Sequence, residues 1–182
     1  MAFSDEQKLI VALLTEIHEK LGIQDGLDAP FVQSIVSSDN TWALRWRYQG
    51  MFKDSETPPN VKRVADVLDM CEVLERTADS LSDEERAQVE AVTGHSVSGA
   101  RFVGYSGNDE DEFHIVQILV DDLGKWGSFK GRDFNAHMPM VDVYDRMLNV
   151  YSGLNSLHNY SATLSVEDLT AVLDARTHPD HR

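Results

Sequence analysis

The chain has 182 residues and a mass of 20.4 kDa, which suits one ordinary domain. Thirty-one acidic residues face sixteen basic ones, so the formal net charge of -15 disfavours nucleic acids and anionic membrane surfaces as partners. The single cysteine, Cys71, excludes an internal disulfide and a four-cysteine zinc site. No apolar run approaches the roughly 20 residues that span a bilayer, and the start of the chain lacks the basic residues of a signal peptide. We therefore expect a soluble, cytoplasmic protein.

Amphipathic helices dominate the N-terminal half. Ser4 and Gln7 form a capping box in front of a helix over residues 4–21, and Gly22 supplies a left-handed residue that ends it. Its apolar residues recur at helical spacing and form one stripe: Leu9, Ile10, Leu13, Leu14, Ile17 and Leu21. Further helices are predicted to begin near Pro30, Thr41, Pro59 and Ser82.

The middle of the chain leaves two interpretations open. Residues 95–105 fit either a turn with a short helix or an extended piece. The apolar residues of 113–123 are β-branched enough for a strand, but the length of the run and its acidic first turn favour a helix that closes at Gly124.

The C-terminal third predicts a packed loop and two more helices. Residues 125–140 form an irregular, aromatic loop that must pack on the body of the protein. Helices are predicted from Pro139 and from Ser165, and residues 177–182 are expected to form a frayed tail. The predicted fold is all-α, a single multihelical domain of about seven or eight helices over residues 1–182.

Several ordered motifs in the C-terminal half resemble those of a known family. They are Phe102-Val103-Gly104-Tyr105, Gly124-Lys125-Trp126, Phe134-Asn135-Ala136-His137-Met138-Pro139-Met140, Tyr144-Asp145-Arg146-Met147-Leu148-Asn149-Val150 and Leu164-Ser165-Val166-Glu167-Asp168-Leu169. With these motifs the chain resembles the YfbU family of bacterial proteins. The resemblance implies an all-helical, cytoplasmic domain without an established activity. Some relatives carry a helix-turn-helix DNA-binding domain beside this one, which implies a ligand-sensing or protein-interaction role.

A small basic and aromatic cluster stands out in this acidic chain. Its candidate ligand-binding residues are Trp126, Arg132, Asn135, His137, Tyr144 and Arg146. Arginine binds carboxylate or phosphate groups bidentately and aromatic rings stack on planar ligands, so the cluster suits a small anionic ligand. In the structural interpretation, which we favour, the arginines pair with nearby aspartates or cap helix and loop carbonyls, and the aromatic rings anchor the loop.

A second aromatic cluster is a candidate subunit interface. It comprises Trp42, Trp46 and Tyr48, which alternate with Arg45 and Arg47. Tryptophan, tyrosine and arginine are enriched at protein interfaces, so the cluster predicts a homo-oligomer, with a dimer favoured. The alternative is that the rings belong to the core.

The sequence gives little support for catalysis. Phosphate loops and the GxSxG motif of hydrolases are absent, and Cys71 lies on the apolar side of a predicted helix, where a thiol is inert. His178 and His181 are close in sequence but lie in the tail, and the other histidines, including His158, are isolated. We therefore expect no bound metal and no cofactor.

The predicted function is that of a non-enzymatic domain that self-associates and binds a small anionic ligand or a protein partner, without nucleic acid or membrane. The alternative is a metal-independent hydrolase in which His137 works as a general acid or base beside Asp133 or Asp142. A third interpretation is an acidic adaptor for a basic protein, whose binding would weaken steeply with salt.

Overall fold

The computed structural model describes residues 3–52, 56–154, 163–178 and 180 of the chain. These residues form eight α-helices and no β-strand, apart from an isolated bridge between Tyr105 and Asn135, which confirms the predicted all-α class and helix number. Part of the expected tail, together with His158 and His181, lies outside the described residues.

The described chain packs as two compact units, Met1–Pro58 and Pro59–Arg182, which we call the N-terminal and C-terminal units. The organisation as a single domain stays a prediction. No helix in the described part of the chain is long and apolar enough to cross a membrane.

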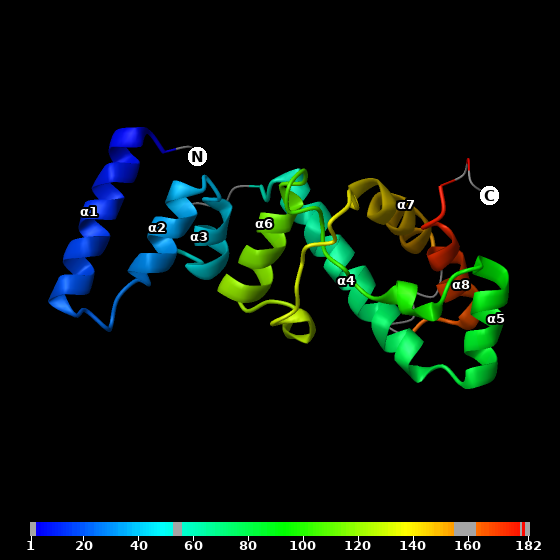
Figure 1. The fold of residues 1–182 in the computed structure, drawn as a ribbon. Coiled ribbons are helices and arrows are strands. Elements are labelled where there is room, and N and C mark those ends of the chain that lie inside the picture. The colour runs from blue at the N-terminus through cyan, green and yellow to red at the C-terminus, as the bar shows by residue number, and fades with distance from the viewer. Residues whose placement is uncertain (1–2, 53–55, 155–162, 179, 181–182) are drawn as a thin grey trace. The chain divides into compact units, whose positions relative to one another are not determined.

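The N-terminal unit consists of α1 (Asp5–Leu21), α2 (Ala29–Ser37) and α3 (Trp42–Arg47) (Figure 1). The Ser4 hydroxyl accepts a hydrogen bond from the Gln7 backbone N–H, and the Gln7 side chain accepts one from the Ser4 N–H. Gly22 ends α1 in the left-handed region, at a φ of 63°. Both predicted ends of this helix are therefore confirmed.

Helix α1 packs on α2 through the side that carries Lys8, Val11 and Thr15. Of the 17 residues of α1, all of them described, Thr15 alone is buried, and its hydroxyl lies 3.5 Å from the Ala29 carbonyl. Lys8 reaches from the same helix to Asp39, with 2.7 Å between Nζ and Oδ2. Because this side of α1 faces α2, the apolar stripe on its opposite side points away from the unit.

The core of the N-terminal unit lies between α2 and α3. Its buried apolar side chains are Ala29, Phe31, Ile35, Val36, Trp42, Ala43 and Leu44. Asp28 caps α2 by accepting a hydrogen bond from the Phe31 N–H, and its other carboxylate oxygen lies 2.7 Å from an Arg47 nitrogen. Arg47 also lies over the Phe31 ring, 4.4 Å from its centroid. One aspartate therefore begins α2 and holds the end of α3.

The long helix α4 (Pro59–Ser80) organises the C-terminal unit (Figure 1). It contacts α6 (Glu112–Gln117), α7 (Val141–Ser152) and α8 (Val166–Asp174), and α8 also packs on α5 (Asp83–Thr93). The side of α4 that these elements cover consists of Val61, Val64, Val67, Leu68, Met70, Cys71, Leu74, Thr77 and Ala78. This helix therefore buries its apolar side in the core of its own unit.

The structure of residues 95–124 decides between the interpretations that the sequence left open. Residues Val97–Ala100 form a short 3-10 helix, after which the chain is extended. Helix α6 continues without a break into a π-helical turn over Ile118–Asp122, so the apolar run is a helix, as predicted. Gly124 follows in the left-handed region, at a φ of 63°.

The extended segments around Tyr105 and Asn135 cross, and this crossing holds the loop of residues 125–140 in place. The Tyr105 N–H donates to the Phe134 carbonyl, and the Ala136 N–H donates to the Tyr105 carbonyl, both over 2.9 Å. The crossing requires Gly104, because a Cβ atom there would lie 1.8 Å from the Phe134 carbonyl oxygen. Beneath it, the Phe102 ring packs on the rings of Phe129, Phe134, Tyr105 and Tyr144.

Candidate functional site

The guanidinium of Arg132, a predicted ligand-binding residue, already binds groups of the protein itself. Its guanidinium makes two hydrogen bonds to the Glu75 carboxylate of α4, at 2.7 and 2.8 Å. It also donates to the Ser128 carbonyl and lies 4.8 Å from the Phe129 ring centroid. The hydrogen bonds that Arg132 donates to Glu75 raise the pKa of Arg132 above its ordinary value. This arginine therefore fastens the loop to α4.

Arg146 closes the end of a neighbouring helix. Its Nε and Nη2 atoms donate to the carbonyls of Ala175 and Arg176, over 3.1 and 2.8 Å, directly after α8. A cation at a helix C-terminus also interacts favourably with the helix dipole. This is the arrangement that the structural interpretation of the sequence describes.

Trp126 and Tyr144 anchor the same loop. The Trp126 indole N–H donates to Asp69 of α4 over 2.7 Å, and the backbone of Trp126 has a positive φ of 45°. Tyr144 is buried, its hydroxyl accepts a hydrogen bond from the Val103 N–H, and burial raises its pKa. The Trp126 contact and the Arg132 contacts both bind the loop to acidic side chains of α4.

Asn135 and His137 lie at the exposed bend of the loop. The Asn135 side-chain oxygen accepts hydrogen bonds from the N–H groups of Gly107 and His137. His137 is exposed and has a φ of 55°. No hydrogen bond or ion pair joins its imidazole to Asp133 or Asp142 in the part of the chain that the structure describes. The contact that a general acid–base pair requires is therefore absent from this bend.

Acidic partners of the loop were missing from the sequence prediction. We expected nearby aspartates, whereas Glu75 and Asp69 come from a helix more than fifty residues earlier. Glu110 was not singled out, yet its carboxylate accepts hydrogen bonds from the N–H groups of Met140, Val141 and Ser106, at 2.6 to 2.7 Å. A carboxylate thus caps the start of α7 from a distant segment, and no spacing in the sequence signals such a pair.

The predicted interface residues take part in the packing of the N-terminal unit. Trp42 is buried and meets the Trp46 ring edge to face, with 5.8 Å between the centroids. Its indole N–H donates to Asn40, and the Tyr48 hydroxyl accepts a hydrogen bond from the Asp28 N–H. The interface role of Trp42, Trp46 and Tyr48 stays a prediction.

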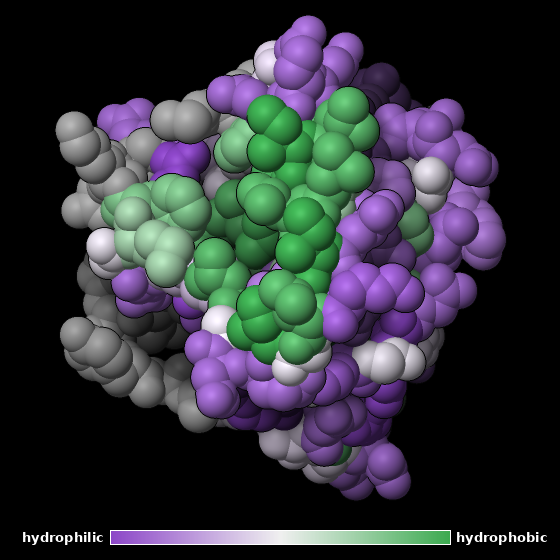
Figure 2. All heavy atoms as spheres, turned by 90° about the vertical axis from the view of Figure 1, so that its left-hand side faces the viewer, coloured by the Kyte–Doolittle hydropathy of each residue, from purple (hydrophilic) through white to green (hydrophobic). Residues whose placement is uncertain are grey.

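An exposed apolar surface lies instead on α1. Its six large side chains are between 52% and 70% exposed, although their spacing is that of a helix packed on a core. Figure 2 shows a continuous green strip with hydrophilic residues along its right-hand side and at both ends. We call this surface the α1 apolar face: Leu9, Ile10, Leu13, Leu14, Ile17 and Leu21. Contiguous apolar patches of this kind mark sites of protein interaction.

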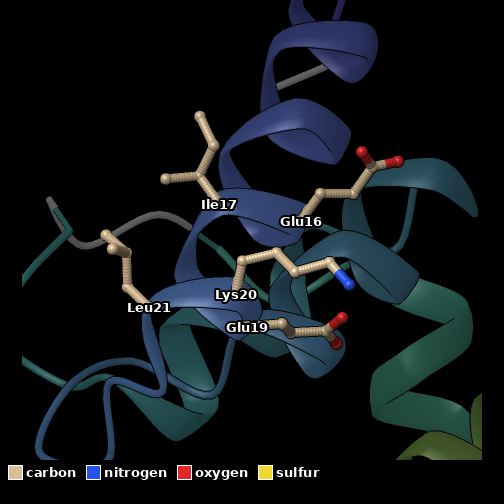
Figure 3. A pocket seen from close by; sticks show the side chains of 5 residues that line it. All are labelled: Glu16, Ile17, Glu19, Lys20 and Leu21. Carbon is tan, nitrogen blue, oxygen red and sulfur yellow. The ribbon is translucent and has the colours of Figure 1, made fainter.

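A shallow hollow of 340 Å³ lies at the C-terminal end of this face. In Figure 3, Ile17 and Leu21 project from one side of the last turns of α1, and Glu16 and Glu19 from the other. Lys20 lies between the two groups and also lines the hollow. Apolar contacts with a charged border are the composition of a protein interface.

A polar hollow of 240 Å³ occurs in the C-terminal unit, beside the end of α4. Arg86 and Arg101 line it together with Glu75, Asp79 and Glu90, so its charge is mixed. Arg86 is already used there, because it donates to the carbonyls of Ala78 and Leu81. With three carboxylates against two arginines, the hollow has no excess of positive charge to attract an anionic ligand.

The described residues include no group of three or more histidine, cysteine, aspartate or glutamate side chains that could hold a metal ion. Cys71 is buried, and burial raises the pKa of its thiol, which keeps it protonated. The expectation that the protein uses no cofactor stays a prediction.

The comparison with known families gives a match over nearly the whole chain. The profile of the YfbU domain matches residues 1–175 of the 182. The match covers the motifs after Phe102 and also the N-terminal helices, including α1. This chain belongs to the YfbU family.

Proposed function

We propose that this protein is a non-enzymatic interaction domain that self-associates through the α1 apolar face. The observation that carries the proposal is that six large apolar side chains of one helix are all more than half exposed. Keeping such a strip in water is unfavourable, by about 25 cal/mol for each Å² of apolar surface that a partner could cover. Covering it is therefore a driving force for association.

The ligand part of the sequence hypothesis has less support. Arg132 and Arg146 are the groups that would bind an anion, and both donate hydrogen bonds to groups of the protein itself. An anionic ligand would have to compete with the Glu75 carboxylate for Arg132. We therefore place the interaction with a protein partner ahead of a small anionic ligand.

The hydrolase alternative also lacks support. It requires His137 in a cleft and in contact with a carboxylate. His137 is exposed, and it lines neither the hollow at the end of the α1 apolar face nor the one beside the end of α4. We propose no catalytic residue.

Size-exclusion chromatography with light scattering, over a wide concentration range, tests the proposal. The wild-type chain is expected to be an oligomer that dissociates on dilution. Ile17→Ser places a hydroxyl in the middle of the α1 apolar face and is expected to weaken association about tenfold or more, since one buried isoleucine contributes roughly 1.5–3 kcal/mol.

Val92→Ser is the matched control. Val92 is an aliphatic residue of α5 that is 65% exposed, and it lies outside the α1 apolar face. This variant should associate like the wild type. A monomeric wild type at every concentration, or equal weakening by both substitutions, would contradict the proposal.

A further inference from the structure

The charges around the α1 apolar face point to the identity of its partner. Glu6 and Lys20 are 14 residues apart, close to four helical turns, so both lie on the side of α1 that carries the apolar residues. Leu13 lies seven residues from each of them, at the midpoint. The face therefore begins with an acidic residue, continues with apolar residues and ends with a basic residue.

Both charged groups are available to a partner. They are exposed, and within the described residues neither has an ion-pair partner. The Glu6 carboxylate accepts a hydrogen bond from the Ser4 hydroxyl, at 2.6 Å, which lowers its pKa and keeps it ionised. A surface with this order of charges is complementary to a copy of itself that runs in the opposite direction.

We propose that the α1 apolar face is covered by α1 of a second copy of this chain, packed antiparallel with the two-fold axis near Leu13. In this arrangement Glu6 of each copy lies opposite Lys20 of the other, and the helix dipoles are also antiparallel. A parallel pair would place Glu6 against Glu6 and Lys20 against Lys20. This inference rests on the proposed function and adds the partner and its orientation to it.

The apolar residues fit such a pair of helices. Leu9, Leu13 and Ile17 follow one another at spacings of four, so about an axis at Leu13 the two copies pack Leu13 on Leu13 and Leu9 on Ile17. The face runs from Leu9 to Leu21, about 18 Å at 1.5 Å per residue. Because α2 packs on the opposite side of α1, the other helices of the N-terminal unit do not cover the α1 apolar face.

A membrane is a poorer occupant of this face. An interfacial helix that binds anionic lipid is rich in lysine and arginine on its polar side. Helix α1 has four acidic residues and two lysines, and the whole chain has a net charge of -15. The net charge therefore opposes binding to anionic lipid, whereas the Glu6–Lys20 contacts favour an antiparallel over a parallel pair of helices.

Disulfide crosslinking of single-cysteine additions distinguishes the two orientations. Leu9 and Ile17 lie four residues on either side of Leu13, so in the antiparallel pair residue 9 of one copy faces residue 17 of the other. Residue 9 then lies about 12 Å along the axis from its own counterpart, too far for a disulfide, which needs Cα atoms roughly 4.4–6.8 Å apart. The full-length chain is used throughout, and wild type with the buried Cys71 is the background control.

The expected result is a crosslinked dimer when Leu9→Cys and Ile17→Cys are mixed under oxidising conditions, and little of it when either variant is oxidised alone. Crosslinking of each variant with itself would overturn the antiparallel arrangement but leave self-association intact. A dimer by light scattering that forms no crosslink in either experiment would show that a different surface associates. A monomer under reducing and oxidising conditions would contradict the proposed function as well.

A charge exchange gives an independent readout. Lys20→Glu is expected to weaken the dimer about threefold to tenfold, because two exposed ion pairs become two like-charge contacts. Adding Glu6→Lys to the same chain restores opposite charges and should recover most of the affinity. Lys62→Glu, on the exposed side of α4, is the control and should have no effect. Failure of the second substitution to recover affinity would contradict the Glu6–Lys20 pairing.

Discussion

Helices α1 and α4 have similar sequence patterns and opposite environments. Each is long and amphipathic, with apolar residues at spacings of three and four. Helix α4 buries nine residues, because α6, α7 and α8 cover its apolar side, whereas α1 buries only Thr15 of its 17 described residues. Amphipathic spacing therefore predicts that a helix has a face to bury, but not whether the same chain or a partner covers that face.

The polar sides of the two helices differ as well. Helix α4 uses Asp69 and Glu75 to bind the loop that carries Trp126 and Arg132. On α1, Lys8 binds Asp39 within the N-terminal unit, and Glu6 and Lys20 are exposed. Helix α4 therefore uses both sides within its own unit, whereas α1 uses one side within its unit and exposes the other.

The largest effect on the free energy of unfolding is expected from a substitution in the core of the C-terminal unit. Leu68→Ala removes a completely buried side chain of α4 and leaves a cavity, which should lower the free energy of unfolding by about 2–5 kcal/mol. Urea denaturation followed by circular dichroism measures it. A loss below 1 kcal/mol would mean that α4 is not the centre of the core.

A smaller loss in the free energy of unfolding is expected from a substitution that releases the loop of residues 125–140 from α4. Arg132→Ala removes both hydrogen bonds to Glu75, whose side chain is 12% exposed, and should cost about 2 kcal/mol. Arg101→Ala, which removes an exposed arginine of the same unit, is the control and should cost less than about 0.5 kcal/mol. An unchanged unfolding free energy for Arg132→Ala, combined with weaker binding of an anion such as phosphate, would instead favour the ligand role.

A modest increase in the free energy of unfolding is expected when Asp69 is replaced by asparagine. Burial, and then the nearby charges of Asp66 and Glu72, raise the pKa of this carboxyl despite its hydrogen bond from Trp126. A raised pKa means that the folded state loses stability as the pH rises from the ordinary aspartate range through the raised value. The Asp69→Asn variant keeps a side-chain oxygen that can accept the hydrogen bond from Trp126. Its free energy of unfolding should be about 0.5 kcal/mol higher than that of the wild type at neutral pH; the effect is small because the group is partly in water. The gain should disappear in acid, and a gain independent of pH would contradict this account.

The smallest effect on the chain's own folding is expected on α1. Leu14→Ala removes a side chain that is 58% exposed, on a helix where alanine is the best helix former. Its effect on the unfolding free energy at high dilution should stay within about 0.5 kcal/mol. A loss as large as that of Leu68→Ala would show that the chain itself buries the α1 apolar face.

Local signals allowed most helix ends to be predicted. Ser4, Ser82 and Ser165 each cap the helix that follows, and Gly22 and Gly94 end two of them in the left-handed region. These features depend on side chains that bond to backbone groups within one turn, so the sequence alone defines them.

The candidate site was harder to predict because its contacts are long-range. The partners of Arg132 and Trp126 lie 57 residues away in the chain, and Glu110 reaches the start of α7 across 30 residues. The α1 apolar face was visible in the sequence as a stripe. Its exposure was not, because exposure depends on which side of the helix packs on α2.

Native mass spectrometry of the full chain, with Leu14→Glu beside the wild type, tests the central claim most directly. The wild type should be a dimer, and Leu14→Glu should be a monomer with unchanged helix content, since glutamate forms helices well and the position faces solvent in a single copy. A monomeric wild type, or a variant that remains as dimeric as the wild type, would contradict association through the α1 apolar face.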